Sequence, residues 1–260
     1  MTAVFETGHA KNMANLLKYN QFLATLGTAY NPSISSITAP ALTNLQITAK
    51  ANLDAVKVAE DAWKDSTNKR EIGFSPLEKF SVQLLGNLKS TDAPQQTVDD
   101  FSFLVNKMRG TSTKATKPNA NKTGFPPVIV DEPNPVIIPP TKSNSQQSFD
   151  QKIEHFTKMI LILQSVPTYT PNETETQVTT LQTQLTTLNT LNSNATNATA
   201  LLKSARINRN TLFYTDNTGM LDIIKKSKNY ILGAFGQGSQ QYKTAISYKF
   251  VRVIPKKKAQ

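Results

Sequence analysis

Two long stretches of this sequence place apolar residues every three or four positions, with no glycine or proline to interrupt them. The first seam comprises Leu42, Leu45, Ala49, Leu53, Val56, Ala59 and Trp63; the second comprises Leu181, Leu185, Leu188, Leu191, Ala195, Ala198, Leu202 and Ala205. This spacing populates one face of an α-helix, and so narrow a stripe is typical of long helices packed side by side. The sequence therefore predicts an all-α protein built around long helices.

An internal repeat relates the two seams. The tripeptide Tyr30-Asn-Pro32 recurs as Tyr169-Thr-Pro171, and Arg70 recurs at the same offset of 139 positions as Arg209. The hydrophobic patterns on both sides of these matches also agree. We therefore expect an internal duplication that produces two related helical bundles.

Proline-rich sequence separates the two copies. The boundaries that follow are a first helical repeat over residues 1–109, a linker over 110–145 and a second repeat over 146–260. Within the linker, Val128–Val130 and Val136–Ile138 are β-branched and apolar, and the neighbouring prolines restrict them to the edge of any sheet.

The C-terminal run Ala245–Ile254 alternates in part and is rich in β-branched residues, which predicts one short strand. On such a strand Tyr248, Phe250 and Arg252 share a face. A minor β element, formed by this strand and the linker, is thus expected beside the helices.

The start Thr7-Gly-His-Ala-Lys-Asn12, the two Tyr-x-Pro breaks, the arginine-led junctions and the ending Phe235-Gly-Gln-Gly-Ser-Gln-Gln-Tyr-Lys243 resemble a family of duplicated helical proteins from the Bacteroidota. That family has no assigned activity and no known catalytic residues. The resemblance covers nearly the whole chain, and it implies a helical architecture and a lineage only.

The residue types that most enzyme and metal sites need are scarce. The chain has no cysteine, which excludes thiol catalysis and cysteine-ligated metal. Its two histidines, His9 and His155, do not correspond at the repeat offset, and neither has the spacing of a zinc motif. Gly236-Gln-Gly238 lacks the strand–turn–helix context of a phosphate loop and is better suited to ending a helix. We therefore predict no catalytic residue, no metal and no cofactor.

Positive charge is concentrated at the C-terminal end. Residues 201–260 hold 12 Lys and Arg against two Asp, so they supply +10 of the net charge of +11. Such a field favours an anionic partner, nucleic acid included, although a solvated surface has the same composition. The candidate contacts are Arg209, Lys225, Lys226, Lys228, Lys243, Lys249, Arg252, Lys256, Lys257 and Lys258. For Arg70 and Arg209 two interpretations stay open, a repeated anion contact or an arginine that bonds the last carbonyls of a helix.

These observations favour a non-enzymatic structural or interaction protein, a scaffold that binds a protein partner or itself. The alternatives are a protein that binds nucleic acid or another anion through the basic C-terminal quarter, and a membrane-active, toxin-like helical component. No run is apolar enough for a transmembrane segment. The N-terminal sequence lacks the order of a secretory signal, so a cytoplasmic location is the default expectation, with export by a leaderless route left open.

Overall fold

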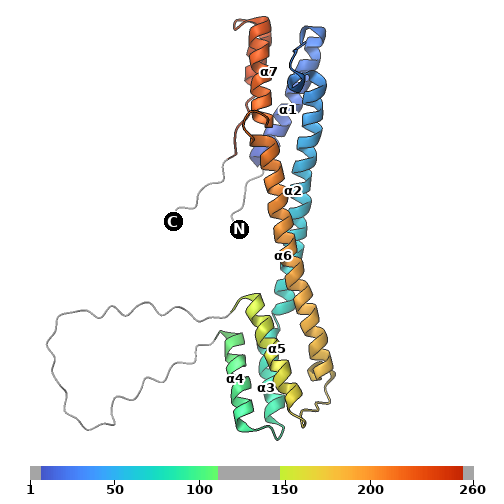
Figure 1. Cartoon of the computed structure of the whole chain (residues 1–260), viewed down its shortest axis with the longest axis vertical. Coiled ribbons are helices and arrows are strands. Elements are labelled where there is room, and N and C mark those ends of the chain that lie inside the picture. Colours follow the sequence, from blue (N-terminus) through green and yellow to red (C-terminus); the bar gives the residue numbers. More distant parts are fainter. Residues whose placement is uncertain (1–6, 111–146, 254–260) are drawn as a thin grey trace, which may run out of the picture. The chain divides into compact units, whose positions relative to one another are not determined.

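The computed structural model describes residues 7–110 and 147–253, and every regular element within these two ranges is a helix (Figure 1). The α-helices are α1 (Thr7–Leu26), α2 (Ala39–Phe74), α3 (Leu77–Lys89), α4 (Gln95–Arg109), α5 (Phe149–Ser165), α6 (Val178–Tyr214), α7 (Met220–Phe235) and α8 (Gln240–Ser247). Three short 3₁₀ turns join them: η1 (Gly27–Ala29), η2 (Ser35–Ile37) and η3 (Thr174–Thr176). The all-α prediction is confirmed.

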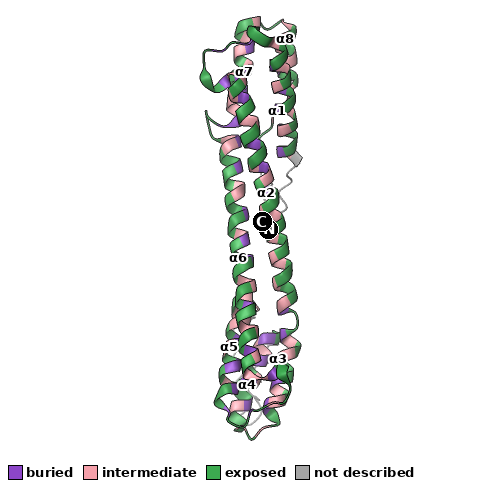
Figure 2. Ribbon diagram, turned by 90° about the vertical axis from the view of Figure 1, so that its right-hand side faces the viewer, coloured by how far each residue is buried: buried purple, intermediate pink, exposed green. Residues whose placement is uncertain are grey.

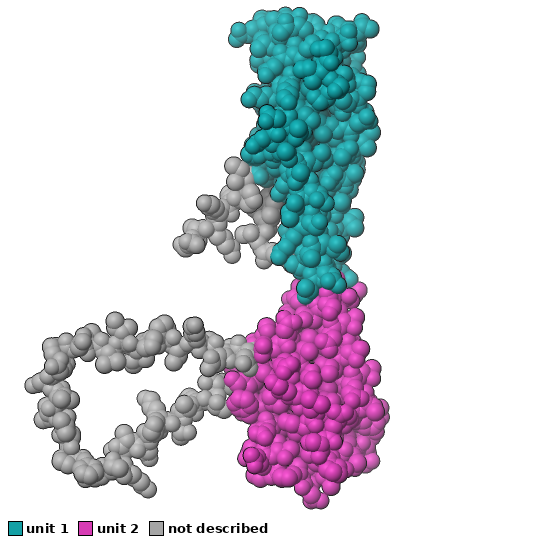
Figure 3. Space-filling model, viewed as in Figure 1, with its two compact units in different colours: residues 1–65, 196–260 teal, residues 66–195 magenta. Residues whose placement is uncertain are grey.

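The described helices form two compact units that are not contiguous in sequence (Figure 3). Unit 1 comprises residues 1–65 and 196–260, and unit 2 comprises residues 66–195. The unit boundaries fall inside α2 and α6, so each unit takes one part of both long helices. The compact bundles therefore do not coincide with the predicted segments 1–109 and 146–260, and the linker predicted over 110–145 lies almost wholly outside the described residues.

Apolar residues spaced for one helical face build a separate core in each unit. The core of unit 1 contains Leu16, Tyr19, Leu23, Tyr30, Leu42, Ala49, Leu53, Phe213, Met220, Ile224, Ile231 and Ala245. The core of unit 2 draws on the end of α2, on α3, α4 and α5, and on the start of α6; its fully buried members include Leu77, Leu84, Leu88, Phe101, Met108, Phe156 and Met159.

The two long helices bury only a narrow seam, as the predicted pattern requires (Figure 2). On α6, buried residues recur every seventh position at Leu181, Leu188, Ala195, Leu202 and Arg209. Side-chain pairs bring α2 and α6 side by side within each unit. The carboxylate of Glu60 lies 3.9 Å from the Arg206 guanidinium in unit 1. In unit 2, Arg70 donates a hydrogen bond of 3.2 Å to Asn192.

The Tyr-x-Pro breaks have the same structural role in both places. The hydroxyl of Tyr30 donates to the carbonyl of Ile37 at 2.5 Å, and that of Tyr169 donates to the carbonyl of Thr176 at 3.0 Å. Each bond spans seven residues and ties the turn before a long helix to the end of the preceding 3₁₀ turn, η2 or η3. The function of this motif is therefore to close the loop that leads into α2 or α6.

The C-terminal strand predicted over Ala245–Ile254 is wrong for the described residues. Ala245 to Ser247 end α8, where Ala245 is fully buried. Tyr248–Val253 form no strand, because side chains of neighbouring helices, and not a second strand, bond their main chain. The two apolar tripeptides of the linker lie outside the described residues, so the other part of the predicted β element is not described.

Candidate functional site

Residues 248–253 of unit 1, called here the C-terminal segment, run beside the helices after α8 ends. Tyr248 begins it with extended backbone at φ −73° and ψ 107°. Side chains alternate at first, since Tyr248 and Phe250 are half-buried whereas Lys249 and Val251 are exposed. The alternation expected from sequence is thus present, although the segment belongs to no sheet.

Side-chain amides of α1 bond the main chain of this segment. The N–H of Val251 donates to Oδ1 of Asn12 at 3.0 Å, and Nδ2 of Asn12 donates back to the carbonyl of Val251 at 2.8 Å. Asn15 donates from Nδ2 to the carbonyl of Lys249 at 2.6 Å. An amide that pairs with both polar groups of one residue replaces the partner that a β-ladder supplies. This is the physical reason why an extended segment persists without a second strand.

An aromatic cluster holds the inward side chains of the segment. The Tyr19 ring lies 5.9 Å from that of Tyr248 and 6.3 Å from that of Phe250, both edge-on. Phe22 adds a contact of 6.1 Å to Tyr248. Edge-to-face pairs at these distances stabilise beyond the area that they bury. The aromatic side chains therefore fix the register of the segment on α1.

Lys228 of α7 completes this surface. Its ammonium donates to the carbonyl of Tyr248 at 2.5 Å, and it lies 5.0 Å from the centre of the Phe250 ring and 5.9 Å from that of Tyr19. Burial, and secondarily the nearby charge of Lys249, lower the pKa of Lys228 to about 8. The lysine is therefore an internal clamp on the segment.

Beneath the aromatic cluster lies a buried network of three hydroxyl groups. The Ser227 Oγ atom is 2.7 Å from the hydroxyls of both Tyr19 and Tyr30. Because the single proton of Tyr30 is donated to Ile37, Ser227 donates to Tyr30 and Tyr19 donates to Ser227. Burial raises the pKa of Tyr19 far above its ordinary value, so the network stays neutral.

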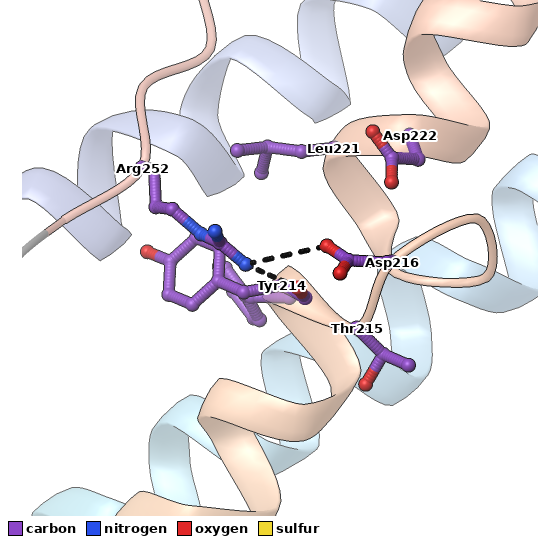
Figure 4. Close-up of a pocket in the computed structure, with 7 residues that line it drawn as sticks. Tyr214, Thr215, Asp216, Leu221, Asp222 and Arg252 are labelled. Atoms are coloured by element: carbon purple, nitrogen blue, oxygen red, sulfur yellow. Dashed lines mark hydrogen bonds and ion pairs between the residues drawn. The ribbon is translucent and has the colours of Figure 1, made fainter.

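A small pocket of about 180 Å³ lies where the segment passes the end of α6 (Figure 4). Arg252 donates to the carbonyl of Tyr214 at 2.5 Å, and its guanidinium lies 3.8 Å from Asp216. The N–H of Val253 donates to the Tyr214 hydroxyl at 3.2 Å. Asp222 accepts the N–H of Asn217 at 2.8 Å. The charged groups of this pocket thus already bond within the protein and tie the segment to α6.

The structure does not gather the predicted basic residues into one contact face. Arg209 is buried, with 2% of its surface exposed, and bonds Asn210 from Nε and Nη2. Its interpretation as a surface anion contact is wrong, because position 209 continues the seven-residue seam of α6. Arg70 does not bond the last carbonyls of a helix either, since it reaches Asn192 and lies over the Phe149 ring at 4.1 Å.

Of the other candidates, Lys225, Lys226, Lys243 and Lys249 are exposed, whereas Lys228 and Arg252 serve the C-terminal segment. Lys226 donates to the carbonyl of Asn217. Lys256, Lys257 and Lys258 lie outside the described residues.

The two histidines lie in different units and face ring systems or apolar surroundings. His9 packs 5.6 Å from Phe213 and 5.8 Å from Tyr214. His155 is 4% exposed, and neither of its nitrogens has a hydrogen-bond partner among the described residues. Burial lowers the pKa of His155, with smaller contributions from Lys158 and Lys107. Residues 7–110 and 147–253 contain no group of acidic or histidine side chains that could hold a metal ion.

No family model, no curated protein and no solved structure matches this chain. Among the helices that the structure describes, none combines the length and the apolar character needed to cross a bilayer. The resemblance to the Bacteroidota family stays a prediction.

Sequence reasoning missed Asn12, Asn15 and Ser227, which do most of the polar work at this surface. A signal for the first two exists. Asn12 and Asn15 precede Tyr19 by seven and four positions, so they extend the buried stripe of α1. Amides on a core-facing stripe need partners, and here the partner is the main chain of a segment more than 230 positions away.

Proposed function

We propose that this protein is a non-enzymatic structural protein that acts through protein–protein contacts, self-association among them. The exposure of apolar side chains on the long helices carries this proposal. In unit 1, Ile47 is 62% exposed and Val58 is 70% exposed on α2, and Leu201 and Ile207 are 65% and 62% exposed on α6. Ile47 and Val58 are 11 residues apart, about three helical turns, so they lie on one face of α2.

Single exposed apolar residues are ordinary, but two aligned β-branched residues on a helix that buries so little suit a helix-to-helix contact. The test is light scattering over a concentration series for the full chain and for the double variant Ile47→Ser, Val58→Ser. We expect the double variant to weaken self-association at least tenfold. Ile34→Ser, at a 55% exposed site outside the long helices, is the matched control. Equal masses for wild type and double variant at every concentration would contradict a contact through this face.

We further infer that the chain arose by internal duplication. Several structural pairs keep the offset of 139: the starts of α2 and α6, the turns η2 and η3, and the hydrogen bonds of Tyr30 and Tyr169. The buried residues of α3 also keep their spacing in α7, at an offset of 143. These residues are Leu77, Ser81, Leu84 and Leu88 in α3 and Met220, Ile224, Ser227 and Ile231 in α7. A duplication followed by a four-residue insertion before α7 accounts for both offsets.

Anion binding is the second candidate, and the exposed Lys225, Lys243 and Lys249 favour it. Retention on heparin or nucleic acid should fall steeply with salt, because each phosphate contact releases counterions. Replacing the three lysines with glutamine should lower the salt concentration for elution. The same change at Lys11, Lys18 and Lys50 should have little effect. Equal elution of both triple variants and wild type would leave the lysines as a solvated surface.

A further inference from the structure

The surface that holds the C-terminal segment recognises an extended peptide as such. We define it as the anchor surface: Asn12, Asn15, Tyr19, Tyr214 and Lys228. Its polar groups bond main-chain atoms of the segment, namely the carbonyls of residues 248, 249 and 251 and the N–H groups of residues 251 and 253. Main-chain recognition gives affinity whatever the side chains are, and the aromatic pockets supply the selectivity.

The segment makes little use of its own backbone. Within the described residues, its main-chain hydrogen bonds go to side chains of α1, α6 and α7, and none joins it to another stretch of main chain. It can therefore leave the anchor surface without breaking a helix or a sheet. The loss falls on the two aromatic rings and on the anchoring amides.

We propose that the anchor surface of one copy binds residues 248–253 of a second copy, so that the chain self-associates by exchanging its C-terminal segment. The inference deepens the self-association proposed above and rests on it. A segment docked from a second copy makes the same contacts as the internal one, so the two forms differ mainly in the entropy of association.

This occupant is favoured over a foreign peptide because its chemistry matches the surface at each step. The aromatic residues at 248 and 250 meet Tyr19 and Phe22. The cationic Arg252 meets the carboxylate of Asp216 and the carbonyl of Tyr214. Val253 packs against Gly8, where an added Cβ would lie 2.7 Å from a methyl group of that valine. A peptide with aromatic, aromatic and basic residues at alternate positions is what the surface selects, and the chain itself supplies one.

The internal segment competes with the exchanged one at an effective concentration on the order of millimolar. A sharp test must therefore weaken the internal contact in one copy while it leaves the surface intact. Val251→Pro does this, because proline lacks the N–H that Val251 donates to Asn12. The side chain of Val251 is 63% exposed, so the change removes little packing, and Val251→Ala is the matched control that keeps the N–H.

The complementary variant, Asn12→Ala, has a defective surface and an intact segment. The full-length Val251→Pro and Asn12→Ala proteins should each elute as a single 28.6-kDa chain in light scattering. Their equimolar mixture should form a one-to-one complex, at least tenfold more stable than any self-complex of either variant. Excess synthetic peptide of residues 247–253 should dissolve the complex, and the same peptide with proline at position 251 should not.

A labelled 247–253 peptide gives a second measurement that does not depend on the complex. It should bind the Val251→Pro protein at least tenfold more tightly than wild type or Val251→Ala, in which the surface is occupied. Circular dichroism establishes that each variant keeps its helices. A mixture that stays monomeric, even with peptide bound to the Val251→Pro protein, would overturn the exchange. Wild-type self-association that Val251→Pro and Asn12→Ala leave unchanged would also overturn it, while the structural function proposed above would stand.

Discussion

The two units share a helical plan but differ at one buried position in the centre of their cores. In unit 2 the third buried residue of α3 is Leu84, and at the matching place in α7 of unit 1 stands Ser227. Both are fully buried. Leu84 packs among apolar side chains, whereas Ser227 bonds Tyr19 and Tyr30. One plan therefore tolerates either an apolar or a hydrogen-bonded centre, provided that each hydroxyl has a partner.

A second difference lies at the end of each unit. In unit 2, α4 runs for 15 residues and buries five apolar side chains. In unit 1, α8 stops after eight residues and the chain continues as the extended C-terminal segment. A helix satisfies its own main chain, but an extended segment depends on other side chains. This dependence makes the end of unit 1 the part of the molecule suited to exchange.

The largest effect is expected from Leu84→Ala in unit 2. The change opens a cavity at a fully buried site, and such changes lower the free energy of unfolding by about 2–5 kcal/mol. Urea denaturation followed by circular dichroism measures the loss. Val82→Ala on the same helix, at a 43% exposed site, should stay within about 0.5 kcal/mol of wild type. Equal losses for the two variants would mean that α3 does not bury Leu84.

Ser227→Ala in unit 1 is expected to cost about 1–3 kcal/mol, because the Tyr19 hydroxyl loses its acceptor while buried. The cavity is small, so the unpaired hydroxyl dominates. The double variant Tyr19→Phe, Ser227→Ala removes both groups and should cost less than the sum of the single changes. Strict additivity in urea denaturation would show that the two hydroxyls do not interact.

The two loop-closing tyrosines provide a smaller and more direct comparison. Tyr30→Phe and Tyr169→Phe each remove a hydrogen bond to a carbonyl seven residues on, worth about 1 kcal/mol. Tyr30→Phe should cost more, because the buried hydroxyl of Ser227 also loses an acceptor. Thermal unfolding of the two variants beside wild type measures the difference. A neutral result at one position and a large loss at the other would break the parallel between the loops.

Much of the helical frame was predictable, because helical spacing reports burial directly. The seams of α2 and α6 identify the helices and most of their buried positions. Two errors share a cause. Ala245–Ile254 has strand-like composition, but main-chain partners decide whether a strand forms, and those partners are Asn12 and Asn15 of α1. The boundaries of the compact units follow from where α2 meets α6, and periodicity within one helix does not contain that information.

The candidate site was less predictable, because charge was a poor guide to exposure. Arg209 belongs to the surface by residue type, yet its seven-residue register with Leu202 places it inside. Lys228 is cationic but clamps the C-terminal segment. The hydroxyl network shows the same limit, since Ser227 gains its role from Tyr19 and Tyr30, each about 200 positions away. Distant pairs of this kind leave no local pattern.

The smallest effect is a pH dependence that belongs to unit 2. Burial of His155 lowers its pKa below the ordinary value of 6.5, with Lys158 and Lys107 acting in the same direction and Glu154 opposing them. As the pH falls through 6.5, the unfolded chain binds a proton that the folded chain does not yet bind. The free energy of unfolding therefore decreases from pH 7 downwards and levels off below the folded pKa. His155→Gln removes this proton and should flatten the stability profile between pH 5 and 7. The measurement is urea denaturation at half-unit steps over that range, where the carboxylates stay mostly ionised. Identical slopes for wild type and His155→Gln would show that His155 titrates alike in the folded and unfolded chain, and so that unit 2 does not bury it in neutral form.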